Sequence, residues 1–69
     1  MNSIYIKSWR TGRCEEYTGT HTIAELKRAM NRQAGGNKFD VYVVTADNRT
    51  YEMDDLNEQF AIDYWGGEA

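Results

Sequence analysis

One segment of the chain constrains the fold more than any other, because it has both the pattern and the ends of a helix. Thr22 is followed three residues later by Glu25, which is the pattern of a capping box at a helix N-terminus. The apolar residues recur at spacings of three and four, which places on one face Ile23, Leu26, Met30 and Ala34. Two glycines, Gly35 and Gly36, end the pattern. The sequence therefore predicts an amphipathic helix over residues 23–34, whose apolar face needs a second layer.

The segment before this helix has the alternating pattern of a β-hairpin. Residues 3–9 alternate between two faces, and Ile4 and Ile6 share one of them. The opposite face receives Tyr5, Lys7 and Trp9. A turn around Gly12 separates this strand from a return strand at residues 14–18.

A second hairpin follows the helix. Residues 39–45 are apolar on both faces, which favours a central strand of the sheet. One face of this strand carries Phe39, Val41 and Val43, and the other carries Tyr42 and Val44. A turn at residues 46–49 leads to a return strand at residues 50–53.

The pattern of residues 54–65 fits two kinds of element. As a helix, Asp55 caps the N-terminus, Glu58 completes a second capping box, and a stripe is formed by Leu56, Phe60 and Tyr64. As a strand, the same segment alternates between apolar and polar residues. We favour a short helical element that starts near Asp55 and can extend to Trp65.

The predicted order is β-β-α-β-β with a short C-terminal helical or strand element. This order defines an α+β fold in which one small, mainly antiparallel sheet packs on a single helix. The 69 residues suffice for one domain, so we assign residues 1–69 to a single small α+β domain.

Few residues of this chain are suited to catalysis or metal binding. Cys14 is the single cysteine and His21 the single histidine, and no geometry in the predicted elements brings them together. We interpret Cys14 as a small hydrophobic residue on the core side of its strand. The carboxylates lack the spacing of a metal-binding loop. We expect a protein without enzymatic activity, cofactor or metal.

The chain carries neither a membrane-spanning pattern nor a secretory signal in its sequence. Its longest apolar runs are two or three residues, whereas a spanning helix needs about 20. The first residues lack the apolar stretch of a signal peptide. We therefore expect a cytoplasmic protein with no membrane partner.

Charge is distributed unevenly along the chain. Residues 1–38 hold seven bases and three acids, whereas residues 39–69 hold one base and eight acids. Arg49 is the last base, and the acids after it are Glu52, Asp54, Asp55, Glu58, Asp63 and Glu68. One interpretation is a solvated acidic face, partly paired with the basic side of the helix. The other is an interface for a basic surface on a partner.

The second interpretation predicts a non-enzymatic inhibitor that binds a larger protein or nucleoprotein complex. Its acidic second half would occupy a basic nucleic-acid-binding surface, with the carboxylates standing in for DNA phosphates. The predicted contact residues are Glu52, Asp54, Asp55, Glu58, Asp63, Tyr64 and Trp65. In a domain this small, Trp65 either folds back over the core or remains exposed as an anchor, and alternation allows one of Tyr64 and Trp65 to be buried.

Two other hypotheses stay open. A small nucleic-acid-binding module would use the basic face of the helix, formed by Lys27, Arg28 and Arg32, with Tyr5 or Trp9 as a stacking platform on an open sheet face. The net charge of −3 disfavours direct nucleic-acid binding. A homodimer or larger homo-oligomer would place the acidic half of one copy on the basic half of another.

In total length, α+β order and the carboxylate and aromatic segment 51–65, the chain resembles the small acidic proteins of bacteriophages and mobile elements. Among these it is most similar to the anti-CRISPR group. The resemblance implies stoichiometric binding to a nucleic-acid-handling complex in the host cytoplasm, often by DNA mimicry. It rests on size, composition and charge layout, and no motif transfers a residue role.

Overall fold

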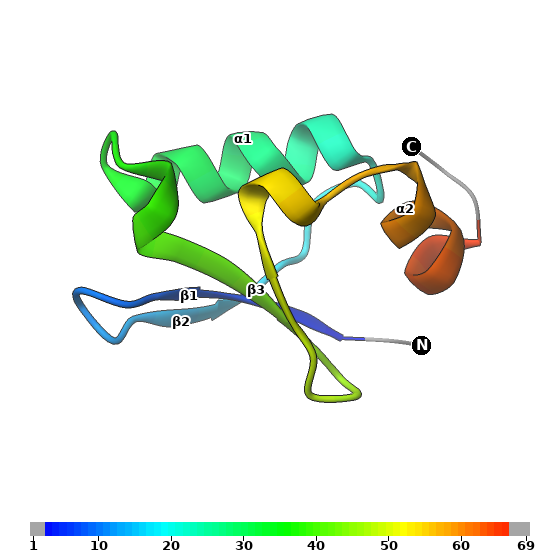
Figure 1. The fold of residues 1–69 in the computed structure, drawn as a ribbon, viewed down its shortest axis with the longest axis horizontal. Coiled ribbons are helices and arrows are strands. Elements are labelled where there is room, and N and C mark those ends of the chain that lie inside the picture. Colours follow the sequence, from blue (N-terminus) through cyan, green and yellow to red (C-terminus); the bar gives the residue numbers. More distant parts are fainter. Residues whose placement is uncertain (1–2, 67–69) are drawn as a thin grey trace.

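Four short strands form the sheet on which the rest of the chain is built (Figure 1). The structure, a computed structural model, describes residues 3–66. The strands are β1 (Ile4–Ser8), β2 (Cys14–Glu16), β3 (Val41–Thr45) and β4 (Thr50–Glu52). Their order is β2-β1-β3-β4 and every neighbouring pair is antiparallel. The predicted α+β class is therefore confirmed, and β1 and β3 are the two central strands.

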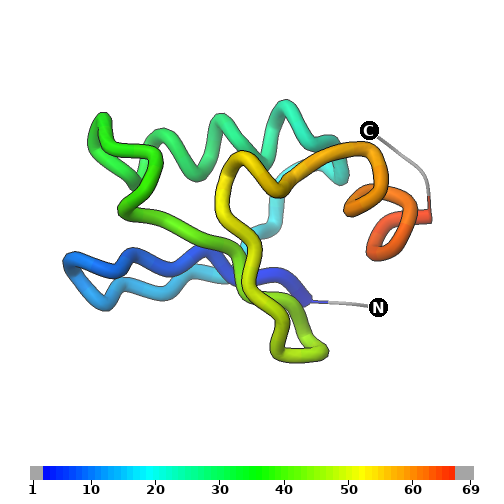
Figure 2. The backbone as a smooth tube through the Cα atoms, in the orientation of Figure 1, coloured from blue at the N-terminus to red at the C-terminus, as the bar shows by residue number. Residues whose placement is uncertain are grey.

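The register separates the two faces of the sheet. In the central pair, Ile6 lies opposite Val43 and Tyr5 lies opposite Val44. Side chains alternate along a strand, so Ile6 and Val43 point to one face and Tyr5 and Val44 to the other. The first face is buried under the helices, and Figure 2 shows the tube of the long helix running across it.

The helix α1 (Ile23–Ala34) has the predicted bounds. The Thr22 hydroxyl oxygen accepts a hydrogen bond from the Glu25 N–H at 3.3 Å, and Gly35 ends the helix in the left-handed region at φ 64°. The reciprocal half of the predicted capping box is absent, because the Thr22 N–H donates to the Thr20 carbonyl. The Glu25 carboxylate instead pairs with Arg28.

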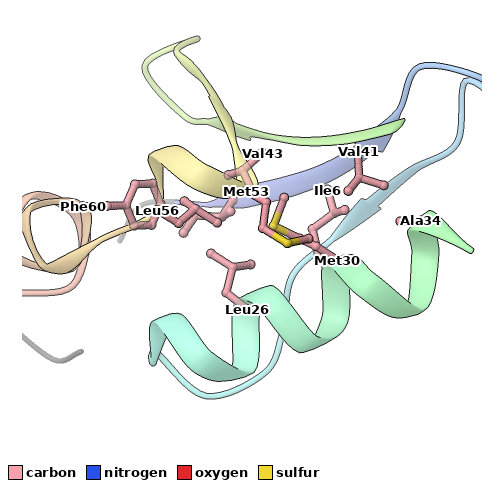
Figure 3. Packing of buried hydrophobic residues seen from close by; sticks show 10 residues of the cluster. Ile6, Leu26, Met30, Ala34, Val41, Val43, Met53, Leu56 and Phe60 are labelled. Carbon is pink, nitrogen blue, oxygen red and sulfur yellow. The ribbon is translucent and has the colours of Figure 1, made fainter. Parts of the chain in front are cut away.

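The core lies between α1 and the inner face of the sheet (Figure 3). Leu26, Met30 and Ala34 are the buried residues of the helix and face the sheet, as the three- and four-residue spacing predicts. The remaining core side chains come from the strands and the C-terminal segment, and the buried cluster as a whole contains Ile4, Ile6, Leu26, Met30, Ala34, Val41, Val43, Met53, Leu56 and Phe60. Each half of the chain therefore contributes to one shared core.

Two residues do not lie where the sequence predicts them, one just before the central strand β3 and one in the first hairpin. Phe39 is not part of β3 but lies in the 3-10 turn η1 (Lys38–Asp40), and it is 61% exposed. The Asn37 side chain accepts a hydrogen bond from the Phe39 N–H, and this local turn interrupts the strand alternation. Cys14 is exposed on the edge strand β2, not packed in the core. It lies opposite Lys7, whose side chain points to the outer face.

The C-terminal segment is helical, which resolves the ambiguity in favour of the predicted helix. It contains the 3-10 turn η2 (Met53–Asp55) and the helix α2 (Glu58–Trp65). The predicted cap is wrong, because Asn57 accepts the hydrogen bond from the Phe60 N–H and Glu58 is already helical. Asp55 instead accepts a hydrogen bond from the Glu52 N–H within η2. The strand predicted for residues 50–53 ends one residue earlier, because Met53 turns into the core.

The helix α2 closes one end of the molecule, next to the start of α1 (Figure 1). The Phe60 ring meets the Tyr51 ring edge to face, with centroids 5.0 Å apart. The Trp65 ring stacks on His21, just before α1, at 5.3 Å. These contacts attach α2 to both layers. None of the helices in residues 3–66 is long and apolar enough to cross a membrane.

Candidate functional site

The predicted acidic contact residues lie on three consecutive elements. Glu52 ends β4, Asp54 and Asp55 lie in η2, and Glu58 and Asp63 lie on α2. All five side chains are exposed. We call Glu52, Asp54, Asp55, Glu58 and Asp63 the acidic strip.

The bases of the first half leave most of the acidic strip without an ion pair. Arg28 and Arg32 both turn to Glu25 of their own helix, at 2.6 Å and 3.9 Å. Among residues 3–66, one base reaches the strip, which is Lys38 at 3.1 Å from Asp54. The hypothesis that the basic side of the helix pairs with the acidic face therefore finds no contact in the described chain.

Members of the strip differ in their local roles. The Glu52 and Asp55 side chains each accept a hydrogen bond from the other's backbone N–H, so both stabilise η2. Asp63 accepts a hydrogen bond from the Gln59 amide at 2.9 Å, one helical turn away. Glu58 and Asp63 are exposed on α2, whose buried residues are Phe60 and Ala61, and neither has an ion pair within residues 3–66. They are the carboxylates of the strip with neither a capping role nor an ion pair among the described residues.

The two aromatic residues at the end of α2 are both half-buried and packed against the core. Tyr64 joins a hydroxyl network in which its oxygen lies 2.9 Å from that of Tyr51 and donates to Asp47 at 3.1 Å. Desolvation is the largest cause that raises the pKa of Tyr64, to about 12. Trp65 stacks on His21 and meets Phe60 edge to face. Both rings therefore hold α2 in place.

Two further carboxylates of the second half have structural partners. Burial of Asp40 acts to raise its pKa, but hydrogen bonds from the Ser8 hydroxyl and the Arg10 N–H hold it below the ordinary value. Hydrogen bonds from the Thr45 and Tyr64 hydroxyls lower the pKa of Asp47 despite its partial desolvation. Asp40 and Asp47 therefore have roles in the fold, and the other described acids of the second half are the members of the strip.

The structure does not bring the alternative nucleic-acid site together. Lys27, Arg28 and Arg32 lie on α1, which covers the inner face of the sheet. Tyr5 and Trp9 lie on the opposite face, because their neighbours Ile4, Ile6 and Ser8 are the buried positions of the strand. The sheet therefore separates the basic helix from the aromatic residues that were expected to extend it.

The outer face of the sheet is the surface that the sequence did not define. We call Tyr5, Lys7, Trp9, Tyr42 and Val44 the open sheet face. The Trp9 and Tyr42 rings stack with centroids 4.0 Å apart and planes inclined at 23°. Alternation alone placed these residues on outer faces, but two segments far apart in the sequence become one surface only through the β1–β3 register. The role of Tyr42 was therefore missed.

A shallow groove lies between the edge strand β2 and α1. Its volume is about 420 Å³, and its polar lining includes Arg13, Glu15, Glu25 and Arg32. Each arginine is already paired with a glutamate of the groove. Among residues 3–66, no three His, Cys, Asp or Glu side chains are grouped closely enough to hold a metal ion. Cys14 and His21 lie on different parts of the fold, so the structure does not assemble a nucleophile and a base from them.

No protein-family model, curated protein sequence or solved structure matches the chain.

Proposed function

We propose that the chain is a non-enzymatic, protein-binding inhibitor whose acidic second half occupies a basic nucleic-acid-binding surface of a larger protein or nucleoprotein complex. The observation that carries the proposal is the pairing pattern of the charges. Arginines of the first half are paired within that half or with Asp40, whereas Glu58 and Asp63 have no cation among the described residues.

The rigidity of the acidic strip supports this function. Phe60 and Ala61 anchor α2 in the core, and the mutual capping of Glu52 and Asp55 fixes η2. Carboxylates held on fixed elements lose little freedom when they meet a basic surface. Unpaired negative charge also accelerates the encounter with a positive partner, and salt weakens this effect. An anti-CRISPR-like inhibitor that mimics DNA would combine these properties.

The acidic strip also guides the choice of variants. Reversing Asp54 and Asp55 would break the Lys38 contact and the η2 cap as well as the surface charge. Glu58→Lys with Asp63→Lys changes mainly the surface charge, because both side chains are exposed and neither caps a turn. Among the described residues, the one side-chain hydrogen bond that it removes is the exposed one from the Gln59 amide to Asp63. A lysine in the first turn of α2 opposes the helix dipole and one in the last turn favours it, so the two effects on stability oppose each other.

The test is a pull-down from a nuclease-treated host lysate with the wild type, the double variant Glu58→Lys/Asp63→Lys and the control Asn31→Lys. Asn31 is exposed on α1, away from the acidic strip, so its replacement adds a positive charge elsewhere on the surface. We expect the wild type and the control to retain the same partner, and the double variant to lose it. Retention should fall as salt rises, and an oligonucleotide should compete with the protein for the partner.

Equal retention by the double variant, or a complex that is insensitive to both salt and oligonucleotide, would contradict the proposal. Circular dichroism of the double variant checks that the fold is intact. Direct nucleic-acid binding through α1 has less support, because Arg28 and Arg32 share the Glu25 carboxylate. It predicts that the wild type itself retards an oligonucleotide in a gel.

A further inference from the structure

The open sheet face contains an aromatic pair whose position is fixed by its neighbours. Trp9 is 64% exposed although its ring stacks on Tyr42 at 4.0 Å. The backbone N–H of Trp9 donates a hydrogen bond to the Asp40 backbone carbonyl at 2.8 Å. The residues on both sides of Trp9 are bound to the Asp40 carboxylate, through the Ser8 hydroxyl and the Arg10 N–H. One face of the indole is therefore covered by Tyr42, and the other is presented to solvent by a rigid turn.

The charges around this pair favour a cationic ligand. Glu52 of the acidic strip lies directly opposite Tyr42 on the neighbouring strand, so its side chain rises beside the tyrosine on the same face. At the other edge, Glu16 lies opposite Tyr5. Lys7 lies opposite Tyr42 on the other neighbouring strand and is the single base on the sheet positions of this face. These positions therefore carry one positive and two negative charges in total. A polyanion is disfavoured there and a cationic side chain is favoured.

We propose that the Trp9–Tyr42 pair is a seat for an arginine side chain of the partner protein, with Glu52 as the neighbouring carboxylate. This inference rests on the proposed function, since it assigns the apolar half of the same interface. A guanidinium stacks flat on an indole ring and also donates hydrogen bonds to a carboxylate. Glu52 belongs to the acidic strip and borders the open sheet face, so the two surfaces are continuous at this residue.

This seat replaces the anchors that the sequence suggested. Tyr64 and Trp65 are engaged in packing α2, whereas Trp9 is the most exposed large apolar side chain in residues 3–66. Tryptophan and tyrosine supply much of the binding energy at protein interfaces. A partner would therefore present arginine to the open sheet face and further basic residues to η2 and α2.

The experiment is a titration of the ¹⁵N-labelled protein with an oligo-arginine peptide, followed by nuclear magnetic resonance. An oligo-lysine peptide of equal length and an oligothymidine are the comparison probes. We expect the oligo-arginine peptide to shift the Trp9 indole N–H and the Tyr42 and Val44 amides, and the oligo-lysine peptide to shift them less. Trp9→Leu should weaken oligo-arginine binding about two- to five-fold.

The matched control is Phe39→Leu, because Phe39 is an equally exposed aromatic residue outside the sheet positions. It should leave the affinity unchanged. Shifts confined to the acidic strip, or equal losses from Trp9→Leu and Phe39→Leu, would overturn the seat while leaving the proposed function intact. The oligo-arginine peptide could shift the resonances of the open sheet face equally in the wild type and in Glu58→Lys/Asp63→Lys. This result would support the seat and count against a role of the acidic strip in binding. A stronger response to oligothymidine would overturn the seat and assign this face to nucleic acid.

Discussion

The two faces of strand β3 differ in what their side chains do, although their residues alternate along five consecutive positions. Val43 points to the inner face and is 0% exposed, packed in the core under the helices. Val44, the next residue, points to the outer face beside Tyr5 and remains partly exposed. The same residue type therefore stabilises the fold on one side and belongs to a candidate interface on the other. In a chain this small, one strand must serve both purposes.

The strongest test of this difference between the two faces is to replace each valine by alanine in turn. Val43→Ala should lower the free energy of unfolding by about 2–3 kcal/mol, because it removes buried methyl groups and leaves a cavity. Val44→Ala should lower it by less than about 1 kcal/mol, because solvent already reaches this site. Urea unfolding measures both values. Equal losses would mean that the outer face is covered in solution, for example by a second copy of the chain.

A smaller loss of stability is expected when the N-cap of α1, the helix that covers the sheet, is removed. Thr22→Ala should destabilise the protein by about 1 kcal/mol, because it leaves the Glu25 N–H at the start of α1 without its side-chain acceptor. Thr22→Asn should retain most of the stability, since asparagine is also a good N-cap. Thermal unfolding of the two variants distinguishes them. Equal destabilisation would indicate that Thr22 acts through packing and not through its cap.

The smallest effect is a change in the pH dependence of stability, at Asp40 just before β3. The pKa of Asp40 is held below its ordinary value of 3.8 in the folded chain, so its contribution is present above that value and is lost as the pH falls through the lower folded pKa. Asp40→Asn should therefore reduce stability at neutral pH and flatten its decline below about pH 4. Urea unfolding across a pH series tests this, and an unchanged slope in Asp40→Asn would contradict it.

The parts of the fold that sequence predicted correctly depend on nearby residues. The bounds of α1 follow from a cap, a spacing and a glycine stop within 14 positions, and the alternation of β1 needs only its own residues. Errors arose where a second local interaction competed with the pattern. Asn37 ended the alternation before Phe39, and Asn57, not Asp55, capped α2.

The candidate site was harder to predict because pairing and register are properties of the folded chain. Sequence located the acidic strip, and the spacing of Glu25 and Arg28 could have shown that this base is paired within α1. The β1–β3 register, which joins Tyr42 to Trp9, connects segments too far apart for any local pattern to indicate. The packing of Tyr64 and Trp65 depends on where α2 meets the sheet, which is also a long-range property.

The position of β1 between β2 and β3 has a consequence for the order in which the chain folds. The hairpin of β1 and β2 can form early, because its strands are separated by a short turn. The other edge of β1 pairs with residues 41–45, which follow α1 in the sequence. The chain must therefore cross the sheet through α1 before this pairing can form. Closing that loop costs entropy before any core contact compensates for it, so this step should set the folding rate. Until β3 pairs with β1, the first hairpin has one unpaired edge. The apolar side chains of Ile4 and Ile6 are then exposed to solvent and to other chains.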